Sequence, residues 1–176
     1  MCKKMCQSYN KQYGSNFISL MPTNLYGKGD NYHLENSHVF AAMIRKIHEA
    51  KIKGKNVTLW GTGTPYREFL YVDDLANACL YLMKNYNSSE IVNVGTGKDM
   101  TIKELAELMK KVIGFEGDII FDSSNPDGTP KKLLDVTKIN SLGWKYSTEV
   151  EDGLKITYND LLENHNDFKS QKFIYK

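Results

Sequence analysis

The segment EIVNVGTGKDMTIKELAELMKKVIG, residues 90–114, gives the strongest local indication of the fold. Its apolar run at residues 90–95 predicts a buried strand. Thr101 followed by Glu104 forms a capping box, so a helix is expected over residues 101–114. A strand that leads through a short glycine turn into a helix is the unit from which α/β folds are built.

The same alternation of strands and helices continues on both sides of this segment. The expected helices span residues 1–12 (ended by Gly14), 38–52 (capped by Ser37), 75–86 (capped by Asp73 or Asp74) and 151–165. The expected strands lie at residues 16–27, which run into a loop, and at 56–60, 67–72 and 117–122. Residues 123–132 read as a polar loop. The pattern therefore predicts an α/β fold.

Composition narrows the class of protein. A chain of 176 residues with 41% apolar and 25% charged residues fits one globular domain, or slightly more, with a substantial core. The 23 Lys and Arg residues nearly balance the 21 Asp and Glu residues without a basic block, which argues against a nucleic-acid surface. The sequence contains no apolar run long enough to cross a bilayer. The N-terminus lacks the apolar core of a signal peptide, so a cytoplasmic location is expected.

The cysteines do not predict a disulfide or a metal site. Cys2, Cys6 and Cys79 are an odd set without CxxC or metal-ligand spacing. We expect reduced thiols and no bound metal, with Cys79 as a small core residue.

Gly95 and Gly97 resemble part of a dinucleotide-binding fingerprint, but Met100 occupies the position of the third glycine. A lone GxG is a weak signal, and a turn before a capped helix is the favoured interpretation.

A second glycine pair, Gly61 and Gly63, precedes a strand and Arg67. A guanidinium matches phosphate oxygens in pairs, so Arg67 is suited to a diphosphate that arrives with a substrate. The alternative is an ion pair with Glu68 or Asp73 on a solvated edge, and the pattern favours neither.

Five motifs carry a resemblance to a known family. They are MPTNLYGKGDN (21–31), NSHV (36–39), WGTGTPYREFLYVDDLA (60–76), NVGTGKDMTIKELAELM (93–109) and PDGTPKKLLDV (126–136). Together they resemble the GDP-L-fucose synthases, which are NADP-dependent epimerase-reductases of the extended short-chain dehydrogenase/reductase superfamily. The resemblance extends from about Met5 to about Phe168.

The resemblance implies the C-terminal part of a Rossmann-like fold with a smaller α/β substrate-binding domain. Residues 1–36 would end the catalytic helix and the dinucleotide-binding sheet, residues 37–168 would mainly bind the nucleotide sugar, and residues 169–176 would form a tail. The family's dinucleotide glycine loop, catalytic serine and cysteine, and Tyr-x-x-x-Lys pair have no counterpart here. The isolated chain is therefore expected to be inactive, and to form a homodimer or associate with a missing N-terminal half.

The resemblance also assigns roles to individual residues. His38, in NSHV, would be the acid of the epimerisation, although its position alone favours a surface or cap residue. Pro22, Thr23, Asn24 and Leu25, with His38 nearby, would contact the nicotinamide end of NADP. Lys46, Trp60, Arg67 and Asp127 would bind GDP-4-keto-6-deoxy-D-mannose, with Lys132 as a further phosphate contact.

Several points stay open on the sequence. The family position of Lys46 usually carries arginine, and a lysine cannot make a bidentate phosphate contact. Trp60, at a strand end, reads on its own as a core residue. His33, His48 and His165 are not expected to be catalytic. The alternatives are a non-catalytic nucleotide-sugar binding module, or part of a GDP-mannose dehydratase or UDP-sugar epimerase.

Overall fold

The computed structural model describes residues 2–33 and 36–164, which form two compact units. The first unit combines the segment ending at Leu25 with Tyr66–Asp99 and Lys131–Thr148. The second combines Tyr26–Pro65 and Met100–Pro130 with the segment that begins at Glu149. This arrangement differs from the contiguous division expected at residues 36 and 37. Parallel strands require long connections, so segments distant in sequence share one unit.

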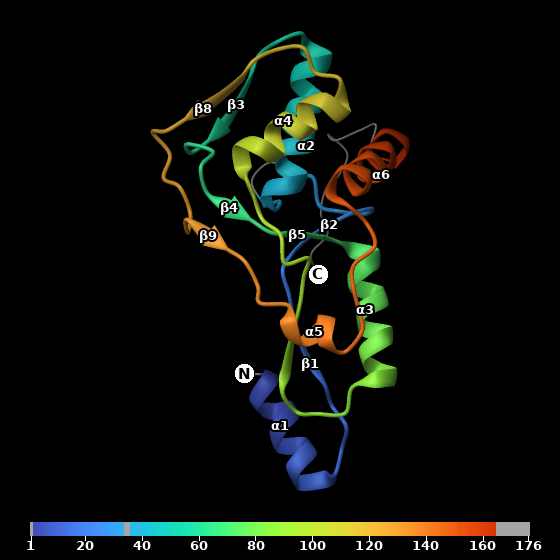
Figure 1. Cartoon of the computed structure of the whole chain (residues 1–176). Helices are drawn as coiled ribbons and strands as arrows, with labels where there is room; N and C mark the ends of the chain where they lie inside the picture. Colours follow the sequence, from blue (N-terminus) through green and yellow to red (C-terminus); the bar gives the residue numbers. More distant parts are fainter. Residues whose placement is uncertain (1, 34–35, 165–176) are drawn as a thin grey trace, which may run out of the picture. The chain divides into compact units, whose positions relative to one another are not determined.

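The first unit is built on a parallel strand pair. β1 (Ser19–Pro22) pairs with β6 (Ile91–Val94) in the register Ser19 to Ile91 through Pro22 to Val94. The unit also contains α1 (Cys2–Tyr13), α3 (Val72–Asn85) and α5 (Thr137–Ser141), and α5 packs against β6 (Figure 1). Its buried core includes Leu70, Ala78, Leu82, Val92, Val94, Ile139 and Trp144. α5 was not predicted from the sequence, because a helix of five residues is too short to show a periodic pattern.

The strand expected at residues 67–72 is divided in two. β4 (Tyr66–Arg67) pairs in parallel with β9 (Lys131–Lys132), and β5 (Phe69–Tyr71) follows after Glu68. The carbonyl oxygen of Glu68 accepts hydrogen bonds from the side chains of Thr23 and Asn24. These bonds take the place of ladder hydrogen bonds at residue 68, which interrupts the strand. A further short strand, β2, spans Asn24–Tyr26.

The second unit contains another parallel pair covered by helices. β3 (Val57–Trp60) pairs with β8 (Ile119–Asp122), and the two strands run side by side in Figure 1. α4 (Ile102–Ile113) packs against both α2 (Val39–Lys53) and α6 (Val150–Asn164), and β7 spans Met100–Thr101. The fully buried residues include Phe40, Ile44, Ile47, Leu105, Met109 and Leu154. Parallel strands with helical connections confirm the predicted α/β fold.

The capping box of α4 is confirmed in atomic detail. The backbone N–H of Glu104 donates to Thr101 Oγ1 over 3.0 Å, and the Thr101 N–H donates to Glu104 Oε2 over 2.7 Å. Gly114 ends the helix in the left-handed conformation, with φ at 68°. The local sequence alone was sufficient here because every capping group comes from within the helix.

The other two predicted caps are wrong. The N-cap of α2 is His38, not Ser37, and the Ser37 hydroxyl is buried without a hydrogen-bond partner among the described residues. α3 begins at Val72, so Asp73 and Asp74 lie in its first turn. Asp74 is not available as a cap because its carboxylate accepts hydrogen bonds from Ser147 and Thr148, far along the chain.

The cysteine side chains match the predicted free state but not the predicted burial. Cys6 and Cys79 are free, but Cys79 is only half-buried. Its neighbour Ala78 occupies the fully buried position on α3. The predicted core role of Cys79 is therefore wrong.

Replacing Asp74 with alanine should lower the free energy of unfolding by about 2 to 3 kcal/mol, because the Ser147 and Thr148 N–H groups would lose their acceptor. The matched control is Asp73→Ala, which removes an exposed carboxylate from the same helical turn. It should cost only about 0.3 to 1 kcal/mol. Urea unfolding measures both, and equal losses would show that the carboxylate bonds of Asp74 are not stabilising.

No helix in residues 2–33 or 36–164 is long and apolar enough to span a membrane. In the same part of the chain, no group of three or more His, Cys, Asp or Glu side chains is placed to hold a metal ion.

Candidate functional site

The Pro22–Leu25 segment lies where the parallel pair of the first unit ends. Pro22 is the last residue of β1, opposite Val94, and the Thr23 N–H donates to the Val94 carbonyl over 3.0 Å. Ligands of α/β folds bind outside the carboxyl ends of parallel strands. The segment therefore occupies the position at which such a fold receives a ligand.

The side chains of this segment are held by one backbone carbonyl. Thr23 Oγ1 and Asn24 Nδ2 both donate to the carbonyl oxygen of Glu68, over 3.2 and 2.8 Å. The amide of Asn24 is thereby oriented, and its Oδ1 is left as an acceptor. A ligand carrying an amide N–H donor fits this arrangement.

The Glu68 side chain is the most buried carboxylate of the described chain, with no solvent exposure. Its Oε1 accepts the N–H groups of Thr96 and Gly97, over 2.6 and 2.8 Å, and its Oε2 accepts the Leu134 N–H over 2.9 Å. Burial of a carboxylate is tolerated when its oxygens accept several hydrogen bonds. The buried role of Glu68 was not predicted from the sequence, although an acidic residue inside the apolar run REFLYV could have indicated a buried carboxylate.

This contact explains the GxG pair of residues 95–97. The Thr96 and Gly97 N–H groups bind an internal carboxylate, so they are not available to a cofactor phosphate. A Cβ at Gly95 would collide with the Glu68 carboxylate. The interpretation of this loop as a structural turn is confirmed.

The structure brings Arg67 and Lys132 together in the first unit. They are directly paired residues of the parallel strands β4 and β9. Arg67 Nη1 donates to the Tyr66 carbonyl over 2.6 Å. Within residues 2–33 and 36–164, neither cation has a carboxylate partner, and Glu68 instead binds backbone N–H groups. The suggested ion pair of Arg67 with Glu68 or Asp73 is therefore absent from the described chain.

The neighbouring Lys131 is held differently. Its Nζ lies 3.2 Å from Asp99 Oδ2 and 5.7 Å from the centroid of the Tyr66 ring. The Lys131 side chain is largely exposed in this ion pair, whereas that of Asp99 is mostly buried. Lys131 is thus partly neutralised, whereas Arg67 and Lys132 have no carboxylate partner among residues 2–33 and 36–164 and are suited to an anion.

In the second unit, His38 occupies the N-terminus of α2. The residue is exposed, and its ring makes no capping hydrogen bond. Asp30 is close enough for the His38 charge to act on it. Burial raises the pKa of Asp30, while the Asn31 N–H and the His38 charge oppose that rise. The imidazole is therefore accessible and has a carboxyl group nearby.

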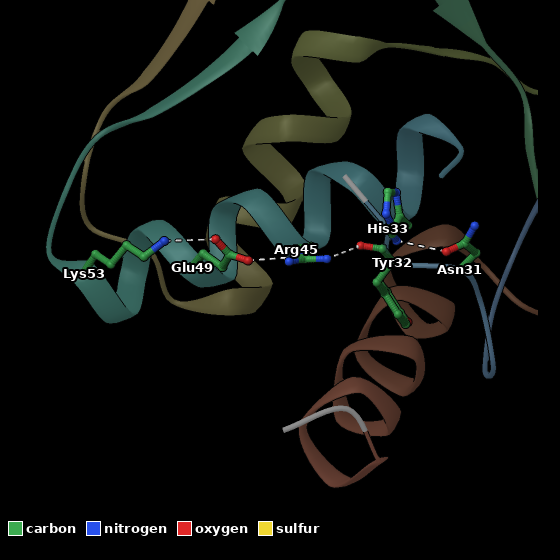
Figure 2. Close-up of polar contacts among 6 residues, drawn as sticks. All are labelled: Asn31, Tyr32, His33, Arg45, Glu49 and Lys53. Carbon is green, nitrogen blue, oxygen red and sulfur yellow. Dashed lines mark hydrogen bonds and ion pairs between the residues drawn. The ribbon is translucent and has the colours of Figure 1, made fainter. Parts of the chain in front are cut away.

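The segment at Tyr32 is connected to α2 by a series of polar contacts (Figure 2). Arg45 Nη1 donates to the Tyr32 carbonyl over 2.9 Å, and Arg45 Nε lies 2.8 Å from Glu49 Oε1. Lys53 Nζ lies 3.0 Å from the other oxygen of Glu49. These contacts lower the pKa of Glu49, although burial opposes them. Arg45 thus fixes the chain shortly before the catalytic candidate.

His48 has a hydrogen-bonding partner in the second unit. Its Nδ1 lies 3.0 Å from the Tyr158 hydroxyl, which connects α2 to α6. Burial lowers the pKa of His48 and raises that of Tyr158. His33 donates its backbone N–H to Asn31 Oδ1 (Figure 2). His165 lies outside the described residues.

Lys46 and Trp60 meet in the second unit. Trp60, at the end of β3, is 70% exposed, so its interpretation as a core residue is wrong. Lys46 Nζ lies 4.9 Å from the centroid of the Trp60 ring. Partial burial lowers the pKa of Lys46. The pair thus combines an exposed aromatic ring with a cation over it, which suits contact with a ring system and an anion.

Asp127 closes the glycine loop that begins at Gly61. The Thr62 N–H donates to Asp127 Oδ1 over 2.9 Å, and Thr62 Oγ1 donates to Oδ2 over 2.6 Å. The N–H groups of Gly61 and Thr64 are also bonded within the protein. These three N–H groups are therefore not free to form an open cradle for a phosphate.

Comparisons with known proteins agree with the motifs. The model of the "NAD dependent epimerase/dehydratase family" matches residues 1–95. The chain is 56% identical over 162 residues to "Probable GDP-L-fucose synthase 1" of Oryza sativa subsp. japonica, which covers 92% of this chain and 49% of the relative. It is 48% identical to "GDP-L-fucose synthase" of Escherichia coli (strain K12), over 94% of this chain and 55% of the relative. The chain thus spans about half the length of these relatives.

Solved structures of nucleotide-sugar enzymes also align with this chain. A GDP-L-fucose synthetase from Naegleria fowleri bound to NADP aligns with a TM-score of 0.87 at 32% identity, over 92% of this chain and 53% of that chain. A GDP-mannoheptose C4 reductase from Campylobacter jejuni with NADP bound aligns with a TM-score of 0.80 at 40% identity, over 91% and 54% of the two chains.

Proposed function

Because the chain belongs to the NAD-dependent epimerase/dehydratase family, we propose that it is the C-terminal part of an NADP-dependent epimerase-reductase. The enzyme would convert GDP-4-keto-6-deoxy-D-mannose to GDP-L-fucose. The names of the relatives at 48% and 56% identity support this choice of substrate and product. Arg67 carries the proposal, because it and Lys132 form a paired cationic position without a carboxylate partner in the described chain.

The residues of each unit are assigned separate roles. Arg67 and Lys132 bind the diphosphate of the nucleotide sugar, and Trp60 with Lys46 contacts its ring systems. Asp127 holds Thr62 through two hydrogen bonds and contributes to substrate binding in this proposal. His38 returns a proton to carbon during epimerisation, a step suited to an accessible imidazole.

Pro22–Leu25 holds the nicotinamide end of NADP in this proposal. The oriented Asn24 amide fits the carboxamide of that ring, since one donates an N–H where the other offers an oxygen. The cofactor supplies the hydride that reduces the 4-keto group. The protein residues orient the ring and exclude water from it.

The proposal includes a cytoplasmic location and association with a second polypeptide. The free thiols Cys6 and Cys79 support a reducing compartment. Met5, Tyr9 and Tyr13 of α1 are 52%, 48% and 65% exposed, and such apolar clusters mark interaction surfaces. The partner would be a second copy or an N-terminal half.

Arg67→Ala should weaken binding of GDP to this chain by about 10- to 150-fold, because a charged hydrogen-bonding contact contributes about 1.5 to 3 kcal/mol. Isothermal titration calorimetry measures the dissociation constants. Lys84→Ala, which removes an exposed cation from α3 in the same unit, is the matched control and should bind GDP like the wild type. Wild-type affinity in Arg67→Ala would remove the basis of the proposed function.

A further inference from the structure

The buried Glu68 connects two loops of the first unit that are distant in sequence. Its carboxylate accepts hydrogen bonds from the backbone N–H groups of Thr96, Gly97 and Leu134. Its carbonyl oxygen, a few bonds away, is the common acceptor for the side chains of Thr23 and Asn24. One residue therefore ties the Thr96–Gly97 turn to the Pro22–Leu25 segment.

The carboxylate determines where that carbonyl lies. A side chain with no exposure and three backbone donors has little freedom, and displacing it would leave buried N–H groups without acceptors. The backbone of residue 68 is held in the same place. Since Asn24 Nδ2 is only 2.8 Å from this carbonyl, the orientation of the Asn24 amide follows from the position of Glu68.

We propose that Glu68 is a positioning residue for the nicotinamide end of the cofactor. Its carboxylate fixes the backbone of residue 68, and the carbonyl of that residue orients Thr23 and Asn24 toward the ligand. The inference rests on the cofactor role proposed above for Pro22–Leu25. It assigns a binding function to a carboxylate that touches neither cofactor nor substrate.

The test uses the isotope-labelled chain and nicotinamide mononucleotide, the nicotinamide half of the cofactor. In the wild type, titration followed by NMR should shift the backbone amides of Thr23–Leu25 and the side-chain amide of Asn24. Glu68→Gln keeps the shape but places an NH2 group against backbone donors. We expect about tenfold weaker binding, comparable to the loss of one oriented hydrogen bond. Glu68→Ala should abolish the shifts, and Glu68→Gln covers the case in which the alanine variant does not fold.

A structural control separates positioning from general destabilisation. Glu104→Ala also removes a carboxylate that accepts a backbone N–H, but in the capping box of α4 in the second unit. It should lower thermal stability without changing the affinity for nicotinamide mononucleotide. Wild-type affinity in Glu68→Gln, equal loss in Glu104→Ala, or absence of shifts at Thr23–Leu25 in the wild type would each overturn the inference.

A parallel GDP titration separates the two proposals. Shifts at Arg67 with GDP, but none at Thr23–Leu25 with the mononucleotide, would refute the inference and leave the diphosphate role of Arg67 intact. The opposite pattern would refute the diphosphate role and leave the cofactor role of Pro22–Leu25 intact, so that the Glu68 variants still decide the positioning role.

Discussion

Replacing His38 with asparagine is expected to lower kcat by about 10² to 10⁴ in an enzyme of full family length that carries this chain, the loss associated with removing a general acid. The substrate dissociation constant should change little. His38 is exposed at the N-terminus of α2 and its ring makes no capping bond, so the substitution removes little structure. Steady-state kinetics separates the two quantities.

The matched control is His33→Asn, the same change at a nearby histidine. His33 has no role in substrate or cofactor binding in this proposal, so kcat should be retained. In deuterated water, the His38 variant should still exchange a substrate proton without forming epimerised product. A kcat equal to the wild-type value, or a loss confined to substrate affinity, would make His38 a binding residue.

Replacing Gly95 with alanine should destabilise the chain by about 3 to 5 kcal/mol, which combines overpacking with loss of buried hydrogen bonds. The added Cβ would meet the Glu68 carboxyl group, whose Cδ would lie only 2.9 Å away. Glutamate side chains usually move aside at little cost. Here movement would break the contacts with Thr96, Gly97 and Leu134.

Gly54→Ala provides the comparison for this prediction. Gly54 has φ of 59° and open space where its Cβ would lie, so alanine there adds backbone strain without a collision. That strain should cost about 1 to 2 kcal/mol. Urea unfolding of both variants gives the difference. If Gly95→Ala costs no more than Gly54→Ala, the carboxylate is not held as tightly as its contacts indicate.

Features set by short-range sequence were predictable. The capping box of α4 and the strand that becomes β6 follow from residues adjacent in the chain. The same applies to the parallel α/β architecture, which rests on alternating periodic segments. In each case the pattern that predicts the element lies within one segment, although the partner of a strand can be distant, as β1 is from β6.

Features set by distant partners were not predictable. Asp74 looked like a helix cap, but Ser147 and Thr148 supply donors for its carboxylate from another part of the chain. Glu68 looked like a solvated partner for Arg67, yet it is buried because three backbone N–H groups surround it. A single sequence does not show which donors a carboxylate will meet.

Some features of the candidate binding residues were predictable from the sequence, and others were not. The pairing of Arg67 with Lys132 depends on β9, a strand within a segment that reads as a polar loop. The exposure of Trp60 also contradicts the usual burial of tryptophan. By contrast, a strand that ends near Pro22–Leu25 was predictable from the order of apolar and polar residues, and β1 confirms the strand. Its predicted burial is wrong, because β1 is half-buried to exposed, and the expected loop contains the short strand β2.

The most direct test of the proposed function compares GDP-L-fucose with UDP-glucose as ligands of the isotope-labelled chain. NMR reports on the indole N–H of Trp60 and the guanidinium Nε–H of Arg67. We predict that GDP-L-fucose shifts both signals, and that UDP-glucose at the same concentration produces clearly smaller changes. Equal or larger shifts with UDP-glucose would assign the chain to a different nucleotide-sugar specificity. No shift at either residue with either ligand would contradict the proposed nucleotide-sugar binding.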